Sequence, residues 1–135
     1  MDKDERERRK RIHEAVKQGA ADEMRTLIAS GAADPHERIG DYDDWTPLTL
    51  AAVYGNLAVV ELLLDAGVHP DARNRFGLLP SVLAASGDAV PHPEVVDLLL
   101  RRGADPDAEM KGRPARHWLD RLRTEHDHAL DKEDD

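Results

Sequence analysis

The histidines of this sequence form the grouping that most resembles a metal-binding or catalytic site. The chain has seven of them, and the densest group is Glu125-His126-Asp127-His128. Two histidines at positions i and i+2 do not share a face of a helix, so they would need an extended backbone to hold one metal ion. The sequence therefore favours a surface helix or a frayed tail here. The alternative is a metal- or ligand-dependent enzyme or sensor that uses this His-rich C-terminal segment.

The rest of the chain offers no recognisable catalytic frame. It has no cysteine, which excludes a thiol nucleophile and a disulfide framework. It contains no Ser-His-Asp order, no phosphate-binding loop and no pair of carboxylates in a familiar spacing. His92 lies between two prolines and is predicted to occupy a solvent-exposed turn. We therefore expect a protein that is not an enzyme and that uses no cofactor and no metal.

Residues 44–67 show which elements make up the chain. Thr46 can cap a helix that begins at Pro47, because proline at the first helical position has no N–H to satisfy. Gly55 ends this short helix, and a second helix follows. Its apolar face comprises Val59, Val60, Leu62, Leu63 and Leu64. Neither helix is long enough to be stable alone, so the pair needs neighbours, and Leu63 is predicted to be buried against them.

The same pattern recurs along the chain. Residues 77–85 repeat the first helix and residues 95–105 the second, while residues 12–19 and 112–115 carry partial copies. These segments resemble the ankyrin repeat, whose consensus reads G-x-T-P-L-H-x-A-A-x-x-G-x-x-x-V-V-x-L-L-L-x-x-G-A. The resemblance implies an all-α fold, an ankyrin-repeat solenoid of stacked helix-turn-helix units joined by β-hairpin-like loops.

The resemblance also divides the chain into three parts. Residues 1–10 are expected to form a charged N-terminal helix extension, residues 11–122 the ankyrin repeat domain, and residues 123–135 a helical or disordered acidic tail. Within the domain we expect units at about 11–43, 44–76, 77–111 and 112–122, of which the first and last are caps. His13 and His117 are expected to serve structural roles in these caps.

Departures from the consensus are concentrated in the third unit. Leu79 stands where the capping Thr belongs, Ser81 replaces an apolar residue, and residues 88–93 are inserted between the two helices. The sequence therefore predicts that this unit is the weakest. Leu79→Thr should stabilise it by restoring the cap, unless Leu79 fills an apolar gap created by Ser81, in which case the change should destabilise it.

The consensus His is also rare in this chain. It is present as His13 in the first unit, but Thr49 and Val82 stand at the equivalent positions of the middle units. We therefore expect the Thr–His hydrogen-bond network typical of these repeats to be incomplete in every unit.

Net charge restricts the class of partner. The formal net charge is −9 and the sequence pI is near 5.2. Such a surface disfavours nucleic acids and anionic membranes, and it favours a partner protein with a basic face. The stretch Arg6–Arg11 is locally basic, which fits either a phosphate-binding patch or a solvated helix. The acidic residues interleaved with it favour the helix.

Composition also bears on where the protein acts. No apolar run is long enough to span a membrane, and the charged N-terminal residues differ from a secretory signal. We therefore expect a cytoplasmic protein that is a monomer on its own. Arginine outnumbers lysine, and Ala, Asp and Gly are common, which suggests a GC-rich bacterial coding sequence.

The family resemblance implies a concave binding surface, made by the hairpin tips and the inner face of the first helices. The aromatic residues Tyr42, Trp45, Tyr54 and Phe76 map to it, and aromatic and Arg side chains dominate the energetics of protein interfaces. The alternative for Trp45 and Phe76 is that they pack between neighbouring hairpins. The full set of predicted partner-binding residues is Tyr42, Asp43, Trp45, Val53, Tyr54, Arg73, Arg75, Phe76, Leu78, Lys111 and Arg113. The predicted function is a protein–protein interaction module that acts as an adaptor, a regulatory subunit or an inhibitor of a partner protein.

Overall fold

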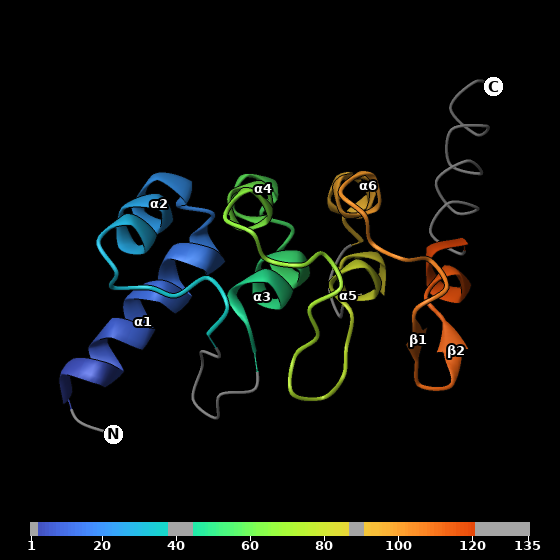
Figure 1. The fold of residues 1–135 in the computed structure, drawn as a ribbon, viewed down its shortest axis with the longest axis horizontal. Coiled ribbons are helices and arrows are strands. Elements are labelled where there is room, and N and C mark those ends of the chain that lie inside the picture. Colours follow the sequence, from blue (N-terminus) through green and yellow to red (C-terminus); the bar gives the residue numbers. More distant parts are fainter. Residues whose placement is uncertain (1–2, 38–44, 87–90, 121–135) are drawn as a thin grey trace.

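Pairs of helices are stacked along the long axis of the molecule in the computed structural model, which describes residues 3–37, 45–86 and 91–120 (Figure 1). The pairs are α1 (Lys3–Gln18) with α2 (Ala21–Ala29), α3 (Pro47–Tyr54) with α4 (Leu57–Asp65), and α5 (Pro80–Ser86) with α6 (Pro93–Arg101). A short antiparallel hairpin of β1 (Glu109–Met110) and β2 (Arg113–Pro114) follows. Residues 116–120 are again helical.

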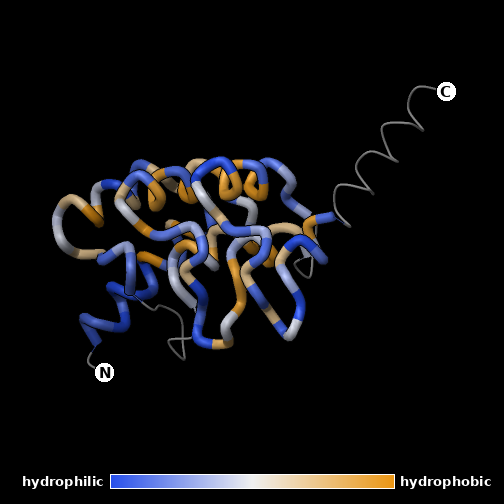
Figure 2. Tube along the Cα trace, turned by 45° about the vertical axis from the view of Figure 1, so that its right-hand side comes forward, coloured by the Kyte–Doolittle hydropathy of each residue, from blue (hydrophilic) through white to orange (hydrophobic). Residues whose placement is uncertain are grey.

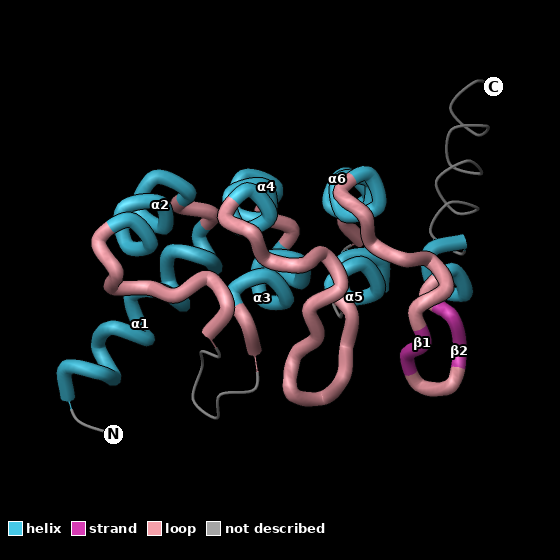
Figure 3. The backbone as a smooth tube through the Cα atoms, viewed as in Figure 1, coloured by secondary structure: helices cyan, strands magenta, loops and turns pink. Residues whose placement is uncertain are grey.

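Two layers of helices run along the stack. In one layer α1 contacts α3 and α3 contacts α5, and in the other α2 contacts α4 and α4 contacts α6. Figure 1 shows the first layer below the second, with the connecting loops extending downward. Within the described residues these loops are irregular except for β1 and β2 (Figure 3). The prediction of an all-α solenoid is therefore confirmed, because similar helix pairs repeat along one axis.

One apolar core runs between the two layers. Leu48, Leu63 and Leu99 are fully buried, which confirms the predicted burial of Leu63. The first helices α3 and α5 contact each other, and each carries two small buried residues, which allow close approach of neighbouring backbones. They are Ala51 and Ala52 on α3, and Ala84 and Ala85 on α5. This burial supplies the stability that helices of this length lack on their own.

A closed hydrogen-bond network begins the second helix pair. The Thr46 side chain accepts a bond from the Thr49 N–H (3.2 Å), and the Thr49 hydroxyl accepts one from the Thr46 N–H (3.0 Å). The two hydroxyl oxygens are 2.9 Å apart. This unit therefore lacks the Thr–His network, as expected, but a Thr–Thr network that the sequence analysis did not foresee takes its place. Threonine at the consensus His position reaches Thr46 directly and forms a reciprocal capping box with it.

Side chains at the N-cap positions of α4 and α6 link each helix pair to the one before it. Asn56, the N-cap residue of α4, donates its amide to the carbonyls of Val16 and Lys17 at the end of α1, with 3.0 Å to Lys17. His92, the N-cap residue of α6, places Nε2 at 3.1 Å from the Val53 carbonyl near the end of α3. Because a carbonyl oxygen only accepts, Nε2 of this histidine carries the proton.

The place of His92 differs from the predicted exposed turn. The residue is half-buried, and its ring packs over Gly55 so closely that a Cβ at position 55 would overlap the ring. Gly55 also has a left-handed φ of 72°, so it both ends α3 and leaves room for the ring. The prediction was wrong because the flanking prolines concealed an equivalence: His92 precedes α6 as Asn56 precedes α4.

The third helix pair buries a hydroxyl that has no partner among the described residues. Ser81 is 1% exposed, and its Oγ makes no hydrogen bond within the described part of the chain. Leu79 is fully buried, and its N–H lies 3.4 Å from the sulfur of Met110 in the hairpin. Leu79 is thus a core residue. This supports the alternative in which it fills an apolar gap, and it removes the reason to expect stabilisation from Leu79→Thr.

Arg8 ties the charged start of α1 to the loop after α2. Its guanidinium donates to both carboxylate oxygens of Glu37 (2.7 and 2.9 Å) and to the Ala32 carbonyl (2.8 Å). Hydrogen bonds from Arg8 and Arg9 also hold the pKa of Glu5 at about 2, below its ordinary value of 4.5. Residues 3–10 and the following residues thus form one continuous helix, α1. The division of the chain at residues 10 and 122 remains a prediction.

Truncation of Leu63 tests the stacking. Leu63→Ala removes a fully buried side chain from the core and should lower the free energy of unfolding by about 2–5 kcal/mol. Equilibrium denaturation in urea measures this difference. A loss below about 1 kcal/mol would contradict the proposed repeat register, because such small losses are typical of surface positions.

Removal of the unpaired hydroxyl tests the weakness of the third pair. Ser81→Ala should raise the free energy of unfolding by roughly 1 kcal/mol, because a buried hydroxyl without a partner costs about that much. Ser86→Ala at the end of the same helix is the matched control, because the Ser86 hydroxyl has a partner: it donates to the Val82 carbonyl at 2.9 Å. This change should not raise the free energy of unfolding. Destabilisation by Ser81→Ala would show that the hydroxyl is satisfied in solution.

The buried position of Leu79 gives the third stability prediction. Leu79→Thr should destabilise the protein by about 2–3 kcal/mol, because it removes buried apolar surface and adds a buried hydroxyl. Thermal and urea denaturation of the variant measure the change. A more stable variant would mean that a missing helix cap outweighs core packing at this position.

Candidate protein-binding surface

The predicted binding residues divide among three places in the structure. Tyr42 and Asp43 belong to residues 38–44 and so lie outside the described residues. The first place is α3 with the two residues before it, and it carries Trp45, Val53 and Tyr54. The second place is the loop 72–78, which carries Arg73, Arg75, Phe76 and Leu78. The third place is the β1–β2 hairpin, which carries Lys111 and Arg113. Each place lies further along the stack than the one before, so the packing of the helix pairs sets the distances between them.

The two ends of α3 differ in exposure. Trp45, just before the helix, is half-buried and packs against the core. At the other end Val53 is half-buried, whereas Tyr54 is 39% exposed. Leu57 at the start of α4 is also 39% exposed, and the sequence interpretation missed it. Its signal was available, because an apolar residue stands there at a variable position of the repeat consensus.

Asn74 shapes the loop 72–78. Its side-chain oxygen accepts hydrogen bonds from the N–H groups of Phe76 (2.9 Å) and Leu78 (3.0 Å), and its own N–H donates to the Leu78 carbonyl (3.3 Å). Gly77 follows with a left-handed φ of 77°. The loop therefore holds Phe76 outward, where its side chain is 62% exposed. Sequence reasoning did not single out Asn74, although a short side chain that bonds to nearby N–H groups is typical of turns.

Arg73 joins the loop 72–78 to the β1–β2 hairpin. Its Nη1 donates to the Gly77 carbonyl in its own loop (3.0 Å) and to the Glu109 carbonyl across the gap (2.6 Å). A second contact joins the same two segments: the N–H of Asp105 donates to a carboxylate oxygen of Asp71 (2.9 Å). The two loops are therefore connected by polar contacts from different chain segments. Arg73 remains exposed, but it has a structural role besides any role in binding.

The β1–β2 hairpin presents two basic side chains at its end. Met110 pairs with Arg113. Lys111 and Gly112 form the turn between the strands, and these two residues have φ values of 52° and 77°. Lys111 and Arg113 are exposed, while the buried Met110 contacts Leu79, the residue just before α5. Figure 2 shows that the downward loops mix hydrophobic and hydrophilic residues, in contrast to the hydrophilic start of α1.

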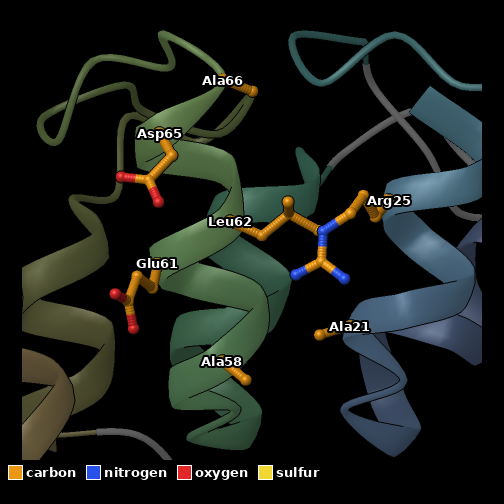
Figure 4. Close-up of a pocket in the computed structure, with 7 residues that line it drawn as sticks. All are labelled: Ala21, Arg25, Ala58, Glu61, Leu62, Asp65 and Ala66. Atoms are coloured by element: carbon orange, nitrogen blue, oxygen red, sulfur yellow. The ribbon is translucent and has the colours of Figure 1, made fainter. Parts of the chain in front are cut away.

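A groove of about 550 Å³ lies on the other layer, between α2 and α4 (Figure 4). Small side chains make it open, and its lining residues are Ala21, Arg25, Ala58, Glu61, Leu62, Asp65 and Ala66. Two of its charges are already compensated: Arg25 pairs with Asp22 at 2.6 Å, and Asp65 pairs with Arg102 at 2.8 Å. The groove is therefore a less favourable binding site than the loops, and it offers positions for control substitutions.

Neither metal ligation nor membrane insertion has support in the described residues. Within them no group of three His, Asp or Glu side chains could hold a metal ion. The segment Glu125–His128 lies outside this part, and His117 packs edge-on against Trp118, with the ring centres 5.1 Å apart. No helix among the described elements is long and apolar enough to cross a membrane.

Comparison with known proteins identifies relatives for about half to three quarters of the chain. GA-binding protein subunit beta-2 of Mus musculus is 46% identical over 66 residues, which is 49% of this chain and 15% of that protein. Ankyrin repeat, SAM and basic leucine zipper domain-containing protein 1 of Atelerix albiventris is 33% identical over 103 residues, covering 75% of this chain and 21% of that protein. Cyclin-dependent kinase 4 inhibitor B of Mus musculus is 42% identical over 60 residues, covering 44% and 43%.

The chain matches only part of the length of these relatives, whereas the family model matches most of the chain. The matched part spans less than half the length of each relative, and all three come from mammals. The bacterial origin suggested by composition thus gains no support from them. The family model for ankyrin repeats in three copies matches residues 12–110, while the predicted last unit at 112–122 lies beyond the match. Since this match covers the stacked helix pairs and the loops between them, the chain belongs to the ankyrin-repeat family.

Proposed function

We propose that this chain is a protein–protein interaction module that binds its partner through its hairpin tips and the exposed end of α3, without catalysis. The observation that carries the proposal is the exposure of apolar side chains. Tyr54, Leu57 and Phe76 are the large hydrophobic residues that stay exposed in the described structure, at 39%, 39% and 62%. Large apolar groups left in water at defined positions are typical of binding surfaces.

The rigidity of the supporting structure favours binding as well. The Asn74 side-chain oxygen accepts hydrogen bonds from the N–H groups of Phe76 and Leu78, which hold the loop around Phe76, and Tyr54 ends a helix whose other residues are mostly buried. Side chains that are already ordered lose less conformational entropy when a partner binds. The exposed apolar surface of both aromatic groups is therefore available to a partner at a reduced entropic cost.

The names of the relatives agree with this class of function. One is a subunit of GA-binding protein, and another is an inhibitor of cyclin-dependent kinase 4. Both names describe proteins that act together with, or upon, another protein. By analogy we propose that this chain is an adaptor, a regulatory subunit or an inhibitor. We also propose that it acts in the cytoplasm as a monomer.

The test is a double truncation of the exposed aromatic residues. Tyr54→Ala combined with Phe76→Ala should weaken binding of the natural partner by at least about tenfold, because aromatic anchors carry much of the energy of an interface. Both side chains are exposed, so the thermal midpoint should stay nearly unchanged. The partner is first recovered from native lysate by affinity purification and identified by mass spectrometry. Calorimetric titration then gives the dissociation constants.

The matched control changes exposed residues of the other layer. Glu61→Ala combined with Asp97→Ala lies on α4 and α6, where both side chains are exposed, and should leave the affinity unchanged. Equal affinities for the wild type and the aromatic double variant would overturn the proposed location. A loss of affinity in the control alone would move the interface to the outer layer, which includes the groove between α2 and α4.

A further inference from the structure

The loop 72–78 and the β1–β2 hairpin form one surface, here called the joined tips. Arg73 makes the connection by donating to the Glu109 carbonyl at 2.6 Å while it also binds the Gly77 carbonyl of its own loop. A second connection, from the Asp105 N–H to Asp71, holds the bases of the two loops together. A partner that contacts one tip is therefore held at a fixed distance from the other.

The joined tips are basic, although the protein as a whole is acidic. They carry Arg73, Arg75, Lys111 and Arg113 against a single acidic side chain, Glu109, and all five residues are exposed. The formal net charge of the whole chain is −9. Of the nearby carboxylates, Asp107 is compensated by its ion pair with Arg116, and Asp71 lies at the base of its loop, where it accepts the Asp105 N–H. Opposite charge on a partner would therefore be attracted to this place in particular.

An exposed aromatic ring lies in the same surface. Phe76 follows Arg75 directly, is 62% exposed, and is kept in place by Asn74. Phenylalanine has no polar group to satisfy in water, so its exposure favours an apolar contact with a partner. The joined tips thus combine fixed positive charge with one fixed apolar anchor.

Resting on the protein-binding function proposed above, we propose that the joined tips bind an acidic segment of the partner protein that contains an apolar side chain. Carboxylates of that segment meet Lys111 and Arg113, and its apolar side chain packs on Phe76. A nucleic acid fits less well. Its phosphates would extend past a patch of this size onto a protein with a net charge of −9, where repulsion opposes binding.

The experiment selects ligands without assuming a partner. A phage-displayed library of random linear peptides is panned on the immobilised full chain at low salt. Selected peptides should be rich in Asp and Glu around an aromatic or aliphatic residue. The best peptide should bind at least about tenfold more weakly to the Lys111→Glu, Arg113→Glu variant and to the Phe76→Ser variant. Its affinity for the wild type should fall as salt is raised, because screening weakens exposed charge pairs.

A matched charge control separates the local from the overall effect. Lys10→Glu combined with Arg101→Glu makes the same change in net charge at exposed positions of α1 and α6, and it should leave peptide binding unchanged. Unchanged thermal midpoints establish that each variant is folded. An equal loss of binding in this control would overturn the proposal, because the effect would then come from net charge alone.

Other outcomes distinguish this inference from the proposed function. If the selected peptides are basic, or if they bind the tip variants as well as the wild type, the acidic-segment inference is wrong. The interaction function still stands in that case if binding of the natural partner depends on Tyr54. If a single-stranded DNA oligonucleotide competes for the joined tips as well as the acidic peptide does, the ligand is an extended polyanion and the inference is likewise wrong.

Discussion

Burial of leucines such as Leu63 and Leu99 between neighbouring helix pairs is the interaction on which the other features depend. Helices α2 to α6 are each between 7 and 9 residues long, and helices of that length are not stable alone in water. Each pair is folded because its neighbours cover its apolar side. The loops are placed by the pairs that flank them, so the distance between two tips is set by how closely the alanine-faced first helices approach.

Polar contacts give this apolar stack its register. Asn56 and His92 each bond to backbone carbonyls at the end of the first helix of the preceding pair, where helical carbonyls have no partner within their own helix. The two side chains differ in chemistry but occupy the same place. This explains how the third pair accommodates an insertion between its helices. His92 and Pro93, which the sequence assigned to the insertion at 88–93, are the N-cap and first residue of α6, so the extra residues precede His92 and the contact to the second pair is kept.

Features set by one helix pair could be predicted from the sequence, and features set by contacts between pairs could not. Thr46, Pro47 and Gly55 identified α3 because capping and left-handed turns act over a few residues. The contacts of His92, and of Arg8 with Glu37, join positions far apart in the chain, so no local pattern indicates them. In the candidate surface the exposure of Tyr54 followed the repeat pattern, whereas the pattern left open whether Phe76 is exposed or packs between hairpins. The role of Arg73 depends on the neighbouring hairpin and became evident in the structure.

The Ser81 hydroxyl, which has no partner in the described part of the chain, has a consequence for local unfolding of the repeat array. In a linear array each repeat is coupled to its neighbours alone, so local unfolding proceeds from an end or from a weak junction. Ser81 lies in α5, between the second helix pair and the C-terminal hairpin. Opening there detaches the hairpin from the rest and separates two loops that Arg73 otherwise holds together. A ligand that bridges both loops binds only the state in which α5 is folded and the two loops are in contact. By linkage, such a ligand stabilises that state and slows amide hydrogen exchange throughout the C-terminal half.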